Sequence, residues 1–128
     1  MTRLGGKIGP TGLLERAVQR ALITGFAYQR CYAVHTPNGA HLAGDAIRRA
    51  RQVAALKKDG VSPGFPDLTV LDHAQLRVGF VEVKREGRTD LDPEQVWWRD
   101  ELHRLGYPWA LANTPDAATG ILRGWGWR

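Results

Sequence analysis

Asp67, Glu82 and Lys84 are charged residues in two apolar, strand-like segments. Asp67 begins the segment DLTVL, and Glu82 and Lys84 lie within FVEVK. Charged side chains are almost never fully buried unless they are paired or bind a metal, so ordinary packing does not explain them. Alternate side chains of a strand point to the same face, which places Glu82 and Lys84 together. These residues are therefore the first candidates for a reactive site.

Two carboxylates and an ammonium group in one small volume suit a hard divalent cation. Neighbouring carboxylates repel each other, and Mg²⁺ binds through one or two carboxylates together with water and phosphate oxygens. A bound metal lowers the pKa of its water and clamps a phosphate, while Lys84 can orient the attacking water or offset charge on the phosphate. General acid or base catalysis alone supplies only about 10²- to 10⁴-fold, so the metal has the central role. Asp67 and Glu82 are the predicted ligands.

The two segments must pair as antiparallel strands if their charges are to meet. Strands are predicted over residues 67–71 and 76–84, with residues 72–75 as the hairpin connection. If the register aligns the open ends of the two strands, Asp67 lies opposite Glu82. The sequence therefore predicts that this pair of carboxylates forms at one end of the sheet.

The elements around this hairpin follow from the spacing of apolar residues. The first helix carries Glu15 on its polar side, which makes this residue a third candidate acid. Asp92-Pro93-Glu94-Gln95 is typical of a helix start, with an N-cap, a proline at the first position and Gln at N3. The other predicted elements are helices over 11–26, 45–58 and 93–105, strands over 28–36 and 107–112, and a short helix over 114–124.

Taken in order, these motifs resemble the VRR-NUC branch of the PD-(D/E)XK nuclease superfamily. That pattern is a helix with a glutamate, a G-x-P-D segment, an apolar-E-apolar-K strand and a Pro-x-Gln helix start. The matching residues here are Glu15, Gly64-Phe65-Pro66-Asp67, Val81-Glu82-Val83-Lys84 and Pro93-Glu94-Gln95. P-D followed by E-x-K is a weak signal by itself, but four ordered elements at compatible spacing form a strong one. The resemblance covers nearly the whole chain from the first helix to the last strand.

The resemblance implies an α/β fold with a restriction-endonuclease-like αβββαβ core, in which a small mixed sheet is flanked by helices. It also implies Mg²⁺- or Mn²⁺-dependent hydrolysis of DNA phosphodiesters. In such a site Asp67, Glu82 and the Val83 carbonyl bind the metal, Lys84 is catalytic, and Gln95 lies beside them. Stand-alone phage and bacterial members are similar to Holliday-junction resolvases and act as homodimers. Branched DNA and a second copy of the chain are thus the expected partners.

The composition is consistent with this interpretation. A chain of 128 residues has the size of one domain, with its core over about 11–124. A formal net charge of +5 and a pI near 9.9 favour a polyanion such as nucleic acid. No apolar run is long enough to span a bilayer, no signal-peptide core is visible, and the single cysteine, Cys31, excludes an intrachain disulfide. A reducing cytoplasm, of a bacterium or a phage-infected host, is expected.

Basic residues are densest in the helix predicted over 45–58. DNA affinity needs Lys and Arg on phosphates, although such a cluster is equally often a solvated helix face. Asn38 lies in a turn signal near the edge of the sheet, and a plain turn is the simpler interpretation for it. The DNA-binding candidates are Asn38, Arg48, Arg49, Arg51, Lys57, Lys58 and Arg85.

Two questions stay open from the sequence. A non-catalytic nucleic-acid-binding or assembly module with the same fold would bind in a salt-dependent manner without metal-dependent turnover. Asp67, Glu82 and Lys84 favour the nuclease, because a binding module does not need them. The aromatic tail over 123–128 is predicted either to stack bases or contact a second copy, or to fold against its own domain.

Overall fold

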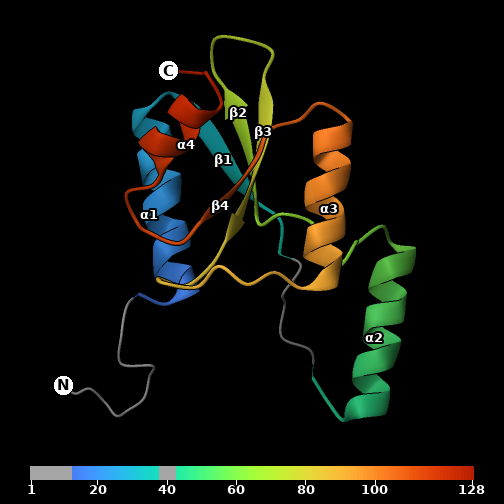
Figure 1. The fold of residues 1–128 in the computed structure, drawn as a ribbon. Helices are drawn as coiled ribbons and strands as arrows, with labels where there is room; N and C mark the ends of the chain where they lie inside the picture. The colour runs from blue at the N-terminus through green and yellow to red at the C-terminus, as the bar shows by residue number, and fades with distance from the viewer. Residues whose placement is uncertain (1–12, 38–42) are drawn as a thin grey trace, which may run out of the picture.

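The structure is a computed structural model and describes residues 13–37 and 43–128. A mixed sheet in the order β1-β2-β3-β4 has antiparallel β1–β2 and β2–β3 pairs and a parallel β3–β4 pair. Helices α1 and α4 cover one face of this sheet and α3 covers part of the other (Figure 1). The predicted α/β class and the small mixed sheet flanked by helices are confirmed. The elements are α1 (Glu15–Tyr28), β1 (Cys31–His35), α2 (Ala46–Lys58), β2 (Leu68–Asp72), β3 (Val78–Val83), α3 (Pro93–Arg104), β4 (Trp109–Ala112) and α4 (Ala118–Gly124).

The core lies between α1 and the sheet. Val18, Leu22 and Phe26 recur four residues apart on α1, and all three are fully buried. This spacing forms one stripe of a helix, and burial of each such side chain contributes about 1.5–3 kcal/mol. The stripe packs against side chains of β2 and β3 that include Leu68, Val70, Val81 and Val83. This packing fixes the position of α1 relative to the sheet, and therefore the position of Glu15.

The aromatic tail folds against its own domain. Trp127 is only 8% exposed and belongs to the core cluster. Trp125 packs on the bare backbone of Gly79 in β3, where an added Cβ would lie 2.3 Å from a ring carbon. Of the predicted alternatives for the tail, the structure shows the intramolecular one.

Aromatic rings hold α3 against the other face of the sheet. Phe65 packs edge-to-face on Phe80 and Trp98, with centroid distances of 5.5 and 4.9 Å, and Phe80 meets Tyr107 at 5.7 Å. Edge-to-face pairs at these distances stabilise beyond their buried area. The Trp98 indole N–H also donates to the Ser62 hydroxyl at 3.0 Å. These contacts join the loop before β2 to α3.

Several element boundaries differ from the predictions. Helix α1 begins at Glu15 rather than at residue 11, because Leu14 has an extended backbone with ψ of 156°. The helix continues to Tyr28 and is followed by Arg30 at φ of 60°, so β1 begins only at Cys31. The predicted strand over 107–112 and helix over 114–124 also begin later, at residues 109 and 118.

The hairpin connection is longer than predicted, because Asp72 caps it with its side chain. The Asp72 carboxylate accepts the Ala74 N–H at 3.0 Å and the Arg77 guanidinium at 2.6 and 3.0 Å. Arg77 is thereby held in the loop, and β3 begins at Val78 rather than at residue 76.

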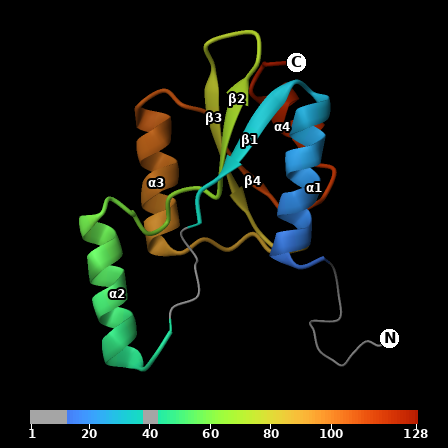
Figure 2. The same ribbon diagram turned by 180° about the vertical axis from the view of Figure 1, so that it is seen from behind.

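Helix α2 stands apart from the rest of the fold in both ribbon views (Figures 1 and 2). It forms as predicted, with the Asp45 carboxylate accepting the Arg48 N–H at 2.9 Å at its N-terminus. None of its residues is buried, and Ile47 on its apolar side is 65% exposed. Within the described ranges, no helix has the length and apolar character needed to cross a membrane.

Candidate active site

The strand register places the first two acids opposite each other. Leu68 pairs with Val81 in the antiparallel β2–β3 ladder. The next step outward brings Asp67 to Glu82, as the sequence predicts, because directly opposite residues of antiparallel strands point to the same face. The two carboxylates thus meet at the end of the sheet.

Helix α1 brings a third acid to the same point. Glu15 is the first residue of α1 and lies one turn before the buried Val18. Oxygens of Glu15, Asp67 and Glu82 all lie within 4.8 Å of one another. Strand pairing joins Asp67 to Glu82, and the packing of α1 on the sheet adds Glu15.

Gln95 links the start of α3 to the acids. Its amide oxygen accepts both the Asp92 backbone N–H and the Lys84 ammonium at 2.9 Å. Its amide nitrogen donates to Glu82 Oε2 at 3.1 Å. The same side chain therefore closes the N-terminus of α3 and positions Lys84 and Glu82.

Backbone contacts fix Asp67 from two sides. The Val83 N–H donates to Asp67 Oδ2 at 2.7 Å. The Asp67 carbonyl accepts the Thr36 N–H at 2.8 Å and lies 3.1 Å from His35 Nδ1. His35 is a site residue that sequence reasoning missed. The signal that was available is its position at the end of β1, beside the end of β2 that carries Asp67.

Gly64 of the G-x-P-D segment allows the loop before β2 to reach α3. Its φ is +82°, and an added Cβ would lie 2.5 Å from the carbonyl carbon of Glu94 and 2.7 Å from the Gln95 nitrogen. Glycine suits this position both for its positive φ and for the close approach of two backbones. The contact brings Asp67 and Gln95 to the same cleft.

The electrostatics of the three acids favour a cation. Glu82 is 3% exposed, and its burial together with the neighbouring Asp67 carboxylate raises its pKa. Burial and Asp67 also raise the pKa of Glu15. Lys84 acts in the opposite direction on both, without balancing the repulsion. Carboxylate oxygens gathered with too little positive charge fit a hard divalent ion, which would neutralise them.

A cleft of about 690 Å³ gives access to these acids. It is polar, and Asp67, Glu82 and Lys84 line it. His35, Pro63 and Gln19 also line it. Such a hollow suits an extended substrate that enters from the surface.

The predicted DNA-binding residues do not gather at the acids. Arg85 lies next to Lys84 and borders a second hollow. Asn38 lies outside the described residues. The remaining candidates are exposed on α2, away from the cleft: Arg48, Arg49, Arg51, Lys57 and Lys58.

A small mixed sheet with carboxylates and a lysine at one end is the arrangement of PD-(D/E)XK nucleases. Within that class the chain belongs to the VRR-NUC family, since the model of the VRR-NUC domain matches residues 15–115. A solved structure described as a VRR_NUC domain protein is similar with a TM-score of 0.63 and 21% identity, over 88% of each chain. The comparison with curated proteins gave no match. The family indicates a nuclease-type function.

Proposed function

We propose that this chain is a metal-dependent endodeoxyribonuclease that hydrolyses phosphodiester bonds, with residues 1–128 acting as one nuclease domain. The observation that carries the proposal is the convergence of Glu15, Asp67 and Glu82 oxygens within 4.8 Å of one another, beside Lys84. Residues that serve stability alone gain nothing from such repulsion. Membership of the VRR-NUC family supports the same conclusion.

The chain's own residues would divide the work as follows. Asp67 and Glu82, with the Val83 carbonyl, would hold Mg²⁺ or Mn²⁺, and Glu15 would complete the acidic wall. When bound, the metal supplies a water of lowered pKa and positive charge for the scissile phosphate. Lys84, held at 2.9 Å by Gln95, presents its ammonium to the cleft and stabilises negative charge on the phosphate.

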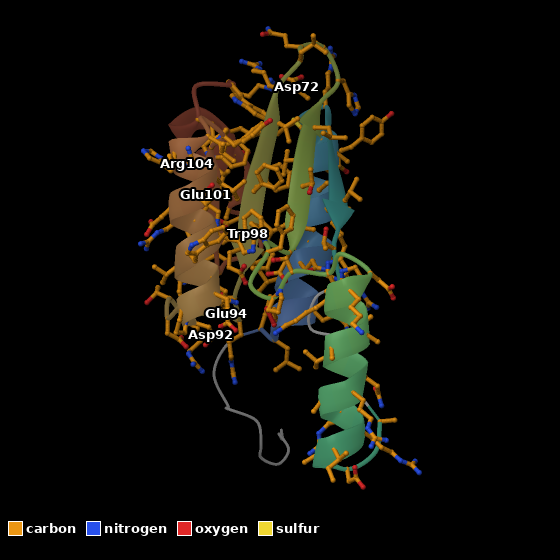
Figure 3. All side chains as sticks on the ribbon, turned by 90° about the vertical axis from the view of Figure 1, so that its right-hand side faces the viewer. Asp72, Asp92, Glu94, Trp98, Glu101 and Arg104 are labelled. Carbon is orange, nitrogen blue, oxygen red and sulfur yellow. The ribbon has the colours of Figure 1, made fainter. Side chains whose placement is uncertain are left out.

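We further propose that the substrate is branched DNA, such as a Holliday junction, and that the protein works as a homodimer in the cytoplasm. One such domain covers little of a four-way junction, whereas a two-fold dimer provides two cuts. The sheet face over β1 and β2 is uncovered beside α3 (Figure 3), and Tyr32 and Val34 on β1 are 62% and 51% exposed. This face is the candidate dimer surface. The buried free thiol of Cys31 suits a reducing compartment.

The test incubates the protein with labelled four-way junction, flap, splayed and plain duplex DNA, with Mg²⁺, Mn²⁺ or chelator. We expect metal-dependent cuts, strongest on the junction, that Lys84→Ala abolishes while DNA binding remains. Salt-dependent binding without any cleavage would contradict the nuclease and favour a binding module. Light scattering at micromolar concentration addresses the dimer, which Val34→Asp should dissociate and Ile47→Asp on α2 should not.

A further inference from the structure

A second hollow of about 580 Å³ lies beside the acidic cleft. Glu15, Arg16 and Lys84 line both hollows, so the two adjoin at Lys84. The loop between β3 and α3 supplies much of the remaining wall, through Arg85, Arg88 and Asp90. A chain of phosphates lying in the cleft could therefore continue into this hollow.

Positive charge exceeds negative charge in the wall of this second hollow. Arg88 donates to the two oxygens of Asp90 at 2.8 and 2.9 Å, and this pairing holds the pKa of Asp90 at about 2. The side chains of Arg16 and Arg85 have no hydrogen-bond or ion-pair partner among residues 13–37 and 43–128. Their guanidinium groups are thus available to an anion.

The loop between β3 and α3, which carries Arg85 and Arg88, is held in place. The Arg88 N–H donates to the Arg85 carbonyl at 3.1 Å, and Gly87 between them has φ of +85°. Positive φ at this position is that of a type II turn, which brings its first and fourth residues together. The Glu86 N–H donates to the Leu13 carbonyl at 3.0 Å, and the Leu13 N–H donates to Glu86 Oε1 at 2.9 Å. The arginines therefore stand on a preorganised turn tied to the start of α1.

We propose that this hollow binds a second phosphate of the nucleic-acid strand in the cleft, next to the phosphate that reacts, with Arg16 and Arg85 as donors. The proposal rests on the proposed nuclease function. Guanidinium groups match phosphate oxygens in planar, paired hydrogen bonds, which makes them suited to this ligand. The strand then runs from the acids past Lys84 towards the turn at Gly87.

The same chemistry fits an internal phosphodiester and a terminal phosphate at a nick or flap. If the ligand is an internal phosphate, the hollow would position any strand that lies in the cleft relative to the acids. If the ligand is a terminal phosphate, the hollow would recognise the phosphorylated end of a strand. The test below separates the two sources.

The test measures binding of duplexes in which each phosphate of one strand is replaced in turn by a neutral methylphosphonate, in chelator, so that no cleavage is needed. In the wild-type protein we expect the replacement at the phosphate next to the reacting one to weaken binding about tenfold, the loss of one charge-assisted hydrogen bond. Arg85→Gln should weaken binding of the unmodified duplex by a similar factor and make that one replacement harmless. Arg123→Gln on α4, an exposed charge away from the cleft, is the matched control and should keep the wild-type pattern.

Duplexes nicked at that position, ending in a phosphate or a hydroxyl, identify the source. A wild-type preference for the terminal phosphate that Arg85→Gln abolishes assigns the hollow to strand ends, and equal binding assigns it to an internal phosphate. The proposal is overturned if the loss of affinity from Arg85→Gln and the loss from methylphosphonate replacement multiply at every position. It is also overturned if Arg85→Gln does not change binding. Cleavage assays on the same duplexes judge the nuclease separately. If the protein cuts DNA but Arg85→Gln does not cancel the effect of the replacement, only the proposed phosphate site is refuted. If Arg85→Gln cancels that effect but the protein cuts no DNA, only the proposed nuclease activity is refuted.

Discussion

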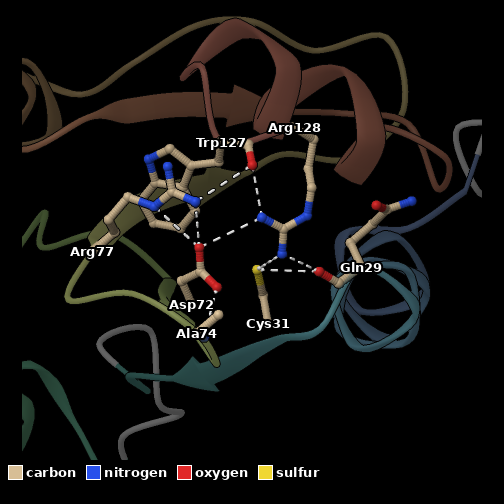
Figure 4. Close-up of polar contacts among 7 residues, drawn as sticks. All are labelled: Gln29, Cys31, Asp72, Ala74, Arg77, Trp127 and Arg128. Carbon is tan, nitrogen blue, oxygen red and sulfur yellow. Dashed lines mark hydrogen bonds and ion pairs between the residues drawn. The ribbon is translucent and has the colours of Figure 1, made fainter.

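An aspartate lies at each end of β2, Asp67 directly before the strand and Asp72 as its last residue, and the two have opposite electrostatic surroundings. Asp67, at the start, faces the carboxylates of Glu82 and Glu15 across less than 5 Å. Asp72, at the other end, is surrounded by donors from the hairpin and the C-terminus (Figure 4). The side chain of Asp72 is 1% exposed, yet its charge is fully matched.

The donors around Asp72 form a closed network. The Ala74 N–H and the Arg77 guanidinium hold the pKa of Asp72 at about 2, with a further contribution from Arg128 at 3.5 Å. Arg77 also lies over the Trp127 ring, 5.1 Å from its centroid. Arg128 in turn donates to the carbonyls of Trp127 and Gln29. Every strong charge here has a partner within the described chain.

The difference indicates what each end is for. A charge buried with its partners ties distant segments together, in this case the hairpin, the end of α1 and the C-terminus. A cluster of like charges at the other end costs folding free energy. Stability and function are therefore expected to respond in opposite directions to substitutions at the two ends of the sheet.

The largest expected effect is on cleavage at the acidic end. Asp67→Asn should lower metal-dependent cleavage by on the order of 10³-fold, because it removes one of the charges proposed to bind the metal. Thermal unfolding in chelator should be unchanged or shifted upward, since a like-charge repulsion disappears. Cleavage assays and melting curves on the same preparation check this. Retained cleavage would show that Asp67 is not a ligand.

Gly64→Ala tests whether the loop before β2 must touch α3. The new Cβ would meet the Glu94 backbone at 2.5 Å in a residue of positive φ, and we expect a loss of about 3 kcal/mol together with reduced cleavage. Gly60→Ala is the matched control, because Gly60 has φ of +97° and no atom within 4 Å of the added Cβ. It should cost only about 1 kcal/mol, from strain alone. Equal losses in denaturant unfolding would contradict the contact.

At the far end, Asp72→Asn should destabilise the fold by about 2 kcal/mol and leave cleavage intact, because it leaves Arg77 and Arg128 without their charge partner. Asp100→Asn, at an exposed pair with Arg99, should change stability by less than about 0.5 kcal/mol. Urea unfolding of the two variants compares them. A cleavage defect in Asp72→Asn would mean that the two ends are coupled.

The smallest effects concern pH, and their signs are opposite. The raised pKa of Glu82 means that its folding contribution is present below the unfolded value near 4.5 and is lost as pH rises through the folded pKa. The lowered pKa of Asp72 gives a contribution present above its unfolded value near 3.8 and lost as pH falls towards about 2.

Unfolding free energies measured in chelator from about pH 3 to about pH 8 test both signs. The advantage of Glu82→Gln over the wild-type protein should grow with rising pH, and the deficit of Asp72→Asn should shrink with falling pH. Differences that stay constant over this range would contradict the assigned causes. Added Mg²⁺ should reduce the Glu82→Gln advantage and leave the Asp72→Asn deficit unchanged.

The sequence by itself determined the local features of this protein. Alternation of apolar residues and the short connection between the two segments were enough to predict that β2 and β3 pair antiparallel, and a register aligned at their open ends would place Asp67 beside Glu82. The run from Asp92 to Gln95 was enough to predict the start of α3, because capping depends on residues within one turn. The acids of the candidate site could be chosen on these grounds, together with the order of the motifs.

Only the tertiary structure decided the contacts between distant segments. The ion pair between Arg77 and Asp72 keeps Arg77 in the loop, so that β3 begins at Val78. The spacing of apolar residues did not indicate this contact. The position of His35 beside Asp67, the approach of Gly64 to α3 and the exposure of α2 likewise depend on how separate elements pack. Periodicity reports which face of an element is apolar, whereas the partner of that face is set by the whole fold.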